Sequence, residues 1–370
     1  MDLVYDKKNM CCGCTACMAA CPHKAIKMRT DAEGFVYPLI DHGLCVDCGI
    51  CRDMCPFPNA PMLKNTEEQT VYSCVHNDEA TLRQSTSGGA FTAISDIILA
   101  MDGAVYGADF DAAYNVVHTR ATTAEQRNRQ RFSKYAQSDM EGVFEKIEQD
   151  LKDGRTVLFT GTPCQVAAVK KYIPADLADN LYLCDLICHS IPSPLIWKEY
   201  KSYQESKYHG KMTEVFFRSK IHPWTRDNSN RGFIFKVKGD DSYHEDNAFY
   251  DLFFKVGTIG RPACEKCAFT STDRVGDITI ADYWGIEEFS PESYNPLGVS
   301  VVITNNKKGE MLAEKMKQTA TLVQRDFAEE KKHQKRLSQP VEYPEYRQQF
   351  WNDLFINGFA YVMNKYVENK

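Results

Sequence analysis

Eight cysteines near the N-terminus form two runs with the same spacing, C-x2-C-x2-C-x3-C-P. This spacing wraps 4Fe-4S clusters in bacterial two-cluster ferredoxins, where the fourth thiolate of each run binds the cluster of the other run. A pair of zinc sites is the alternative, although zinc sites usually show separate C-x2-C pairs. We expect two 4Fe-4S clusters, the first held by Cys11, Cys14, Cys17 and Cys55, and the second by Cys45, Cys48, Cys51 and Cys21.

Four further cysteines are scattered, and the spacing of each one alone is a weak signal. Cys164 and Cys188 each follow a strand-like run where a turn begins, which is where α/β proteins build sites. With the C-x2-C pair of Cys264 and Cys267 they supply enough thiols for a third 4Fe-4S cluster. A lone cysteine is usually a small buried apolar residue, and we assign no ligand role to three others, Cys12, Cys74 and Cys184.

The composition excludes several classes of protein. Of the 370 residues, 43% are hydrophobic and 25% are charged, and the formal net charge of −6 makes nucleic acid an unfavourable partner. The first residues lack the pattern of a signal peptide, and the apolar runs are too short to span a membrane. An odd number of cysteines, 15, without an export signal favours metal ligation over disulfides. We therefore expect a soluble, cytoplasmic protein.

The middle of the chain alternates between strand and helix patterns. RTVLFTGTPCQVAAVKKY and LYLCDLICHSIPSPLIWKEY each read as strand, turn and helix, with Ser193 as the N-cap of the second helix. Two such units predict a partly parallel sheet. Ser138 and Glu141 are expected to form a capping box. The basic run Lys331–Arg336 is expected to be a solvated helix. The chain contains neither G-x-G-x-x-G nor a P-loop motif.

Six ordered segments carry a resemblance to a known family. They are STSGGAFTAIS, SKYAQS, GTPCQVAAVKK, DLICHSIPSP, RPACEKCAF and DRVGDITIADYWGI. Together with the N-terminal cysteine runs, they resemble the coenzyme F420 hydrogenase/dehydrogenase beta subunit family over roughly residues 8–315. CHSIP and ADYWGI are closer to the bacterial branch of that family than to the branch that uses the deazaflavin, so the resemblance leaves the deazaflavin substrate in doubt.

The resemblance implies a fold class and an order of domains. We expect an α+β protein, with a bacterial-type dicluster ferredoxin module followed by a mixed α/β flavin-binding core and a helical C-terminal tail. The expected parts are a ferredoxin-like domain at 1–60, a linker at 61–70, a flavin-proximal domain at 71–155, a domain with flavin and the third cluster at 156–325, and a tail at 326–370.

The resemblance also implies cofactors and the residues that hold them. It implies FAD, and it matches the four scattered cysteines to a third 4Fe-4S cluster. Two segments match flavin-proximal motifs of the family. The first begins a helix with small residues, which leaves backbone N–H groups open to an anion, although an ordinary glycine entry to a core helix is the alternative. The matching residues are Ser87, Gly88, Gly89 and Thr92 in the first segment and Ser133, Lys134 and Tyr135 in the second.

Three more residues are candidates for the chemistry of the site. His189, beside Cys188, is the best candidate for a proton donor because imidazole titrates near neutral pH, although a structural role is the alternative. Asp282 and Tyr283 follow a strand and are expected to line the flavin pocket. A lysine such as Lys134 can neutralise a pyrophosphate, unless the run from Arg127 is simply a solvated basic face.

Together these features imply an iron-sulfur flavoprotein oxidoreductase. It would pass electrons between 4Fe-4S clusters and FAD, because clusters carry one electron while hydride chemistry moves two. The expected partners are ferredoxin or another low-potential carrier and a small soluble substrate, either coenzyme F420 or a bacterial metabolite such as a sugar derivative. The alternatives are an electron-relay subunit that needs a catalytic partner subunit, and a scaffold that holds zinc.

Overall fold

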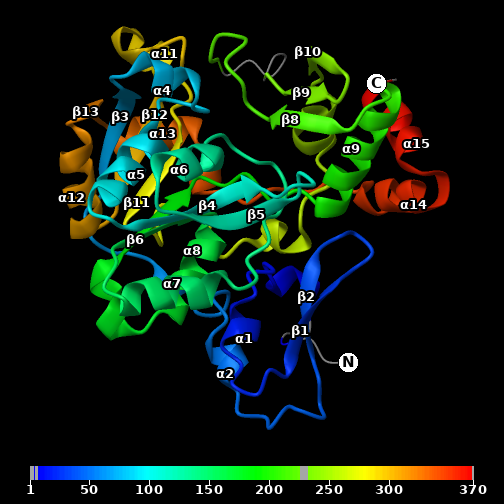
Figure 1. The fold of residues 1–370 in the computed structure, drawn as a ribbon, viewed down its shortest axis with the longest axis horizontal. Coiled ribbons are helices and arrows are strands. Elements are labelled where there is room, and N and C mark those ends of the chain that lie inside the picture. Colours follow the sequence, from blue (N-terminus) through cyan, green and yellow to red (C-terminus); the bar gives the residue numbers. More distant parts are fainter. Residues whose placement is uncertain (1–3, 5–6, 226–231, 369–370) are drawn as a thin grey trace.

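An eight-stranded sheet forms the centre of the structure, a computed structural model that describes residue 4, residues 7–225 and residues 232–368 (Figure 1). Across the sheet the strands are β13 (Ala320–Arg325), β3 (Thr70–His76), β12 (Ser300–Thr304), β11 (Ile278–Asp282), β7 (Leu181–Leu186), β6 (Val157–Gly161), β4 (Ala104–Phe110) and β5 (Val116–Ala121). β11, β7, β6 and β4 run parallel, and the other neighbours are antiparallel. The expected partly parallel sheet is confirmed.

Helices cover both faces of this sheet (Figure 1). One face packs against α5 (Ala90–Ala100) and α12 (Lys307–Met316), and the other packs against α7 (Val143–Lys152) and α8 (Pro163–Tyr172). Residues 157–159 of β6 are a continuous apolar run because their side chains alternate between these two buried faces. Shorter helices at the sheet are α4 (Glu79–Arg83), α6 (Ala124–Gln130), α11 (Ile286–Phe289) and α13 (Phe327–His333).

A smaller unit lies beside the central sheet (Figure 1). Its antiparallel strands follow the order β10 (Asp240–Glu245), β9 (Ile234–Val237) and β8 (Met212–Phe216). An aromatic core, which includes Trp197 and Trp351, joins these strands to the surrounding helices. The helices are α9 (Pro194–Lys207), α10 (Ala248–Tyr250), α14 (Arg347–Asn357) and α15 (Phe359–Met363). The last two belong to the helical C-terminal tail, which is confirmed.

The two cysteine runs lie in a module at the lower edge of the molecule in Figure 1. Its strands β1 (Ile26–Thr30) and β2 (Val36–Ile40) form an antiparallel hairpin. The short helices α1 and α3 pack against α7 and α8, so the module docks on one face of the central sheet. The helices of the module are α1 (Ala16–Ala19), α2 (Ile50–Asp53) and α3 (Ala60–Leu63).

Two local expectations at helix starts had different outcomes. Ser193 is the N-cap of α9, as expected, and its hydroxyl accepts hydrogen bonds from two backbone N–H groups. The capping box of Ser138 and Glu141 is wrong, because Gly142 is the N-cap of α7. The Ser138 hydroxyl instead contacts the His118 ring at 2.8 Å, so tertiary contacts took the place of the local cap.

Among the described residues, none of the helices combines the length and the apolar composition that crossing a membrane requires.

A buried ion pair fixes the end of β7. Asp185 and Arg274 are 2.9 Å apart, and both side chains are at most 1% exposed. Asp185 also accepts hydrogen bonds from the backbone N–H groups of Val275 and Gly276.

Removing this carboxylate leaves a buried guanidinium without its counter-charge. Asp185→Asn is therefore expected to lower the free energy of unfolding by about 3–5 kcal/mol, measured by urea denaturation.

The control for this variant is an exposed ion pair. Glu79 and Arg83 form an i,i+4 pair with side chains that are more than half exposed. Glu79→Gln is therefore expected to change the urea midpoint very little, since solvent screens such pairs. Equal midpoints for the two variants would contradict the importance assigned to the buried pair.

Candidate functional site

The structure brings together the four thiols expected at the first cluster. Burial raises the pKa of Cys17, and the neighbouring thiols of Cys11 and Cys55 raise it further. A hydrogen bond with Cys12 lowers the pKa of Cys14, but burial and the thiols of Cys17 and Cys55 outweigh it and raise the pKa overall. These groups therefore resist ionisation together unless a cation binds them, and a metal takes thiolates as ligands.

The four thiols expected at the second cluster line one small cavity of about 150 Å³. Burial raises the pKa of Cys51, and the thiols of Cys21 and Cys45 add to the rise. Cys48 is exposed, whereas Cys14 of the first set is buried. The second set therefore lies nearer to solvent than the first.

The four scattered cysteines also converge. Cys164 lies in the first turn of α8, Cys188 follows β7, and the other two lie at a short helical turn, Pro262–Lys266. Burial raises the pKa of Cys188, and the thiols of Cys264, Cys164 and Cys267 raise it further, in that order. Sheet pairing and the loop before β11 therefore gather thiols that the sequence spacing leaves apart.

Cys12 lies between two of these sets. Its thiol interacts with Cys14 of the first set and with Cys164 of the third. The sequence alone indicates no ligand role for Cys12. In the structure its thiol lies between the first and third sets and contacts both. The other unassigned thiols, Cys74 and Cys184, are fully buried in the core beside the sheet.

The chemistry of the donor sets fits 4Fe-4S clusters. In a 4Fe-4S cube four cysteine thiolates surround a group of irons instead of a single ion. Within the described ranges, no group of three or more His, Cys, Asp or Glu side chains has the close spacing that one metal ion needs. The second set lines one cavity, and the thiols of the first and third sets interact with one another, so each set offers the four cysteines that a cube takes as ligands.

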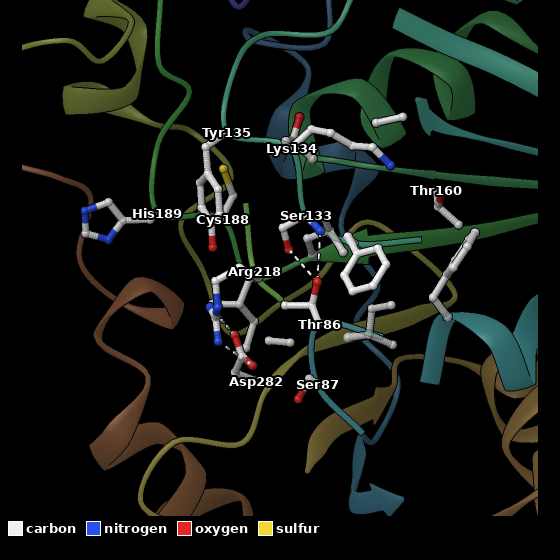
Figure 2. A pocket seen from close by; sticks show the side chains of 18 of the residues that line it. Thr86, Ser87, Ser133, Lys134, Tyr135, Thr160, Cys188, His189, Arg218 and Asp282 are labelled. Atoms are coloured by element: carbon white, nitrogen blue, oxygen red, sulfur yellow. Dashed lines mark hydrogen bonds and ion pairs between the residues drawn. The ribbon is translucent and has the colours of Figure 1, made fainter. Parts of the chain in front are cut away.

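A cavity of about 570 Å³ adjoins the third set of thiols. It lies at the carboxyl ends of β6, β7 and β11, where open α/β sheets bind ligands. Cys188 and His189 line it, and so do Asp282 and the residues from Ser133 to Tyr135. Its volume is within the usual range of small-molecule sites, and Figure 2 shows part of its lining.

The SGG segment lies at one wall of this cavity. Ser87, Gly89 and Thr92 line the cavity, whereas Gly88 does not. A Cβ on Gly88 would lie 2.0 Å from the carbonyl oxygen of Cys74, so this glycine serves close packing between strands. Gly89 begins α5 with a φ of +84°, which favours glycine.

Ser133, Lys134 and Tyr135 of the second expected segment line the cavity as well. The Ser133 N–H donates to the Thr86 hydroxyl at 2.9 Å, which ties the two motifs together (Figure 2). Burial lowers the pKa of Lys134 to about 7. Its ammonium donates to the backbone carbonyls of Arg129 and Arg131, so its charge is already engaged by the chain.

An ion pair missed by the sequence analysis lies in the same cavity. Asp282 pairs with Arg218 at 3.2 Å and accepts a hydrogen bond from the Trp224 indole N–H at 2.8 Å. Burial lowers the pKa of Arg218, but the Asp282 carboxylate outweighs this and raises it. Asp282 thus anchors a cation that comes from the end of β8. Tyr283 is fully buried beside the sheet and does not line the cavity.

His189 lies at the edge of the cavity, on the opposite side of Figure 2 from Thr160. Its ring packs against the rings of Phe253 and Phe254, with centroids 5.3 and 4.9 Å away. The Arg336 Nε lies 3.4 Å from its Nδ1. The histidine is therefore held between aromatic rings and a cation.

The expectation of a solvated helix at Lys331–Arg336 is only partly right. Lys331 and Lys332 are exposed, whereas Lys335 and Arg336 line the cavity. The chain turns back toward the sheet after α13. A run of charged residues in the sequence does not indicate this turn. With Arg131 and Arg218 these residues give the cavity an excess of positive charge, because Asp282 is the one carboxylate in its lining as described.

Buried polar atoms without partners test whether a cofactor fits here. Thr92 Oγ1, Gln130 Oε1 and Arg131 Nε line the cavity and have no hydrogen-bond partner among the described residues. Buried polar groups are normally satisfied, so these three atoms are available to a group bound in the cavity. A polar, anionic group such as FAD fits these donors and acceptors.

Two segments of the sequence match models of known families. Residues 10–59 match the 4Fe-4S dicluster domain, and residues 154–330 match the C terminus of the coenzyme F420 hydrogenase/dehydrogenase beta subunit. A solved chain of the F420-reducing NiFe hydrogenase complex from Methanosarcina barkeri is 18% identical, with a TM-score of 0.44, over 70% of this chain and 82% of that one. The search of curated proteins finds no match.

Iron content tests the three donor sets. Protein reconstituted without oxygen is expected to hold about twelve irons and as much acid-labile sulfide per chain. Cys264→Ala is expected to remove about four irons, whereas Cys74→Ala, at a buried thiol of the core, is expected to remove none. Zinc in place of iron, or about eight irons with and without Cys264, would contradict the third cluster.

Proposed function

The chain joins a 4Fe-4S dicluster domain to the C-terminal domain of the coenzyme F420 hydrogenase/dehydrogenase beta subunit, and we propose that it is an FAD-dependent iron-sulfur oxidoreductase. One observation carries this proposal. Cys188 belongs to the third set of thiols and also lines the large cavity. A cluster on these thiols would therefore lie directly beside a ligand in the cavity.

The order of the sites supports a path for electrons. The second set is the nearest to solvent, and the thiol of Cys51 links it to the first set through Cys17. Cys12 contacts both Cys14 and Cys164, so the first and third sets are neighbours. A low-potential carrier such as ferredoxin would deliver or collect electrons at the second cluster, and the path would end at the cavity.

FAD in the cavity would supply the conversion between one-electron and two-electron chemistry. The chain's own residues have separate tasks in this proposal. Ser87, Gly89 and Thr92 form one wall, and the Ser133–Tyr135 segment forms another. The unpaired Arg131 Nε would bind a negatively charged part of the cofactor, since burial lowers the pKa of this guanidinium and an anion would offset the cost.

His189 is the proposed proton donor to the substrate. It lies on the same loop as Cys188 and lines the cavity, and Arg336 holds its Nδ1 side. We propose a small soluble substrate, either coenzyme F420 or a metabolite of the bacterial branch such as a sugar derivative.

The proposed domains divide at residues 60, 70, 155 and 325, which places β3 and α5 with the flavin-proximal part and α13 with the tail.

The flavin site is tested at Gly89. A Cβ there would lie 2.8 Å from the His76 Cβ and would force a strained φ, so Gly89→Val is expected to displace the cavity wall and lower bound FAD severalfold. The FAD released by denaturation is measured per chain by fluorescence. Gly142→Val is the matched control, because Gly142 also begins a helix at positive φ but has open space around it.

Unchanged FAD content in Gly89→Val, or equal losses in both variants, would move the flavin site away from this wall. FMN in place of FAD, from protein purified without oxygen, would contradict the identity of the cofactor.

Electron transfer tests the oxidoreductase against a relay subunit. Reduced ferredoxin is expected to reduce the bound flavin, and Cys48→Ser is expected to slow this step at least tenfold because it removes a ligand of the entry cluster. Direct exchange between flavin and substrate is expected to stay unchanged in that variant. Both steps are followed by stopped-flow absorbance, with Cys184→Ala as the control for a cysteine of the core.

Candidate substrates decide between the two functions. We expect deazaflavin, nicotinamide or an activated keto-sugar to reoxidise the reduced flavin in one two-electron step. A flavin that exchanges electrons with none of them until a partner protein is added would identify a relay subunit instead.

A further inference from the structure

Arg261 is completely buried where the N-terminal module meets the rest of the chain. Its Nε donates to the Cys11 carbonyl at 2.7 Å, and its Nη2 donates to the Val36 carbonyl at 2.8 Å. Its Nη1 donates to the Gln137 side-chain oxygen at 2.7 Å. The guanidinium also lies over the Tyr37 ring, 4.5 Å from its centroid. Each of the three nitrogens of the guanidinium therefore has a hydrogen-bond acceptor.

The charge of Arg261 has no carboxylate partner in the described part of the chain, since its hydrogen bonds end on carbonyls, an amide and a thiol. A buried cation is costly unless an anion lies beside it. Asp185 is that anion for Arg274, whose side chain is also almost fully buried. The position of Arg261 therefore requires another source of negative charge.

Cysteine thiolates of two different sets can supply that charge. Nη2 of Arg261 lies 3.7 Å from Cys11 Sγ, in the first set. The Cys264 N–H donates to the Arg261 carbonyl at 3.0 Å, so the same residue also adjoins the third set. A cube with four thiolates carries a charge of about −2 when oxidised and gains a further negative charge on reduction.

The second set lies nearer to solvent and in a mixed environment, since Asp47 and Arg52 both line its cavity. Cys45 Sγ lies 3.7 Å from a carboxylate oxygen of Asp47, and Cys48 is exposed to solvent. A carboxylate opposes the extra negative charge of a reduced cluster, whereas a buried guanidinium that donates to sulfur stabilises it.

We propose that Arg261 is a shared positioning residue of the first and third clusters, and that it raises their reduction potentials above that of the second cluster. Electrons that enter at the second cluster would then move downhill to the first cluster, toward the cavity. This inference rests on the proposed function for the presence of three clusters and deepens it by assigning a direction to the path.

The backbone at the first cysteine run is shaped around this guanidinium. Gly13 has a φ of +68°, and a Cβ on it would lie 2.7 Å from Arg261 Nη1 and 2.7 Å from the Gln137 amide nitrogen. The space between Cys11 and Cys14 is therefore filled by the arginine and its partner. A side chain at Gly13 would displace the guanidinium from Cys11.

The test compares Arg261→Met with Arg347→Met in the full chain carrying its clusters. Arg347 also joins the module to the rest of the chain, through an ion pair with Glu33 and a hydrogen bond to the Gly260 carbonyl, and it is the matched control. Midpoint potentials are measured by redox titration followed by EPR. Variants Cys48→Ser and Cys264→Ser assign the signals of the second and third clusters.

In Arg261→Met the potentials of the first and third clusters are expected to become more negative, while that of the second stays unchanged. Arg261→Lys keeps the charge and is expected to give a smaller shift. Arg347→Met is expected to shift none of them. If Arg261→Met does not hold its iron, Arg261→Gln is titrated in its place, because it also removes the charge. If neither variant holds its iron, the potentials of Arg261→Lys decide whether Arg261 has the proposed role.

Unchanged potentials in the variant that is titrated, or an equal shift of all three clusters, would overturn the role of Arg261. These potentials are measured without substrate and do not require flavin. Failure of FAD binding or of substrate turnover would therefore overturn the proposed function separately, and an iron content below three clusters would be seen before any titration.

Discussion

The parallel pairing of β6 with β7 is the constraint on which both candidate sites depend. Gly161 and Asp185 are paired in register, so the two strands end at the same edge of the sheet. Cys164 and Cys188 each come three residues after this pair, which brings the two thiols to one place. The cavity opens at this same edge, because the backbone turns away there and leaves the carboxyl ends of the strands uncovered. The Asp185–Arg274 ion pair then fixes the loop that follows Cys267 against the end of β7.

The sequence alone predicts those parts of the site whose geometry is local. In each N-terminal run three ligands of one cluster lie within a span of seven residues, so the spacing itself specifies the cluster. The scattered cysteines are different, since their proximity arises from strand pairing and from the Asp185 contact. The spacing of cysteines in the sequence indicates neither the strand pairing nor this contact. The family resemblance was what favoured one cluster site for these four cysteines. β3 and β13 were not among the expected strands, and β3 begins at Thr70, where the expected linker ends.

The charges of the site were the least predictable part. Arg218 comes from the smaller unit and reaches Asp282 across the cavity, a contact between residues 64 positions apart. Arg336 belongs to a run that resembles a solvated helix, yet its Nη1 donates to the Pro340 carbonyl and its Nε lies beside His189. Lys134 was expected to face an anion, but it is held by backbone carbonyls. In each case the tertiary structure decides whether a charged residue that would be expected in solvent becomes part of the cavity.

Gln137 shows how the cluster module and the cavity are coupled. Its side chain lines the cavity, accepts a hydrogen bond from Arg261 and donates one to the Cys12 carbonyl at 2.9 Å. The preceding residues of the same segment, Ser133 to Tyr135, line the cavity as well. A ligand that orders this segment would therefore also fix Gln137, and with it the guanidinium beside Cys11. The same contacts also connect the first cluster to the cavity. Assembly of that cluster would therefore hold one wall of the cavity in place. The short SKYAQS segment thus links two sites that the chain builds from distant parts of its sequence.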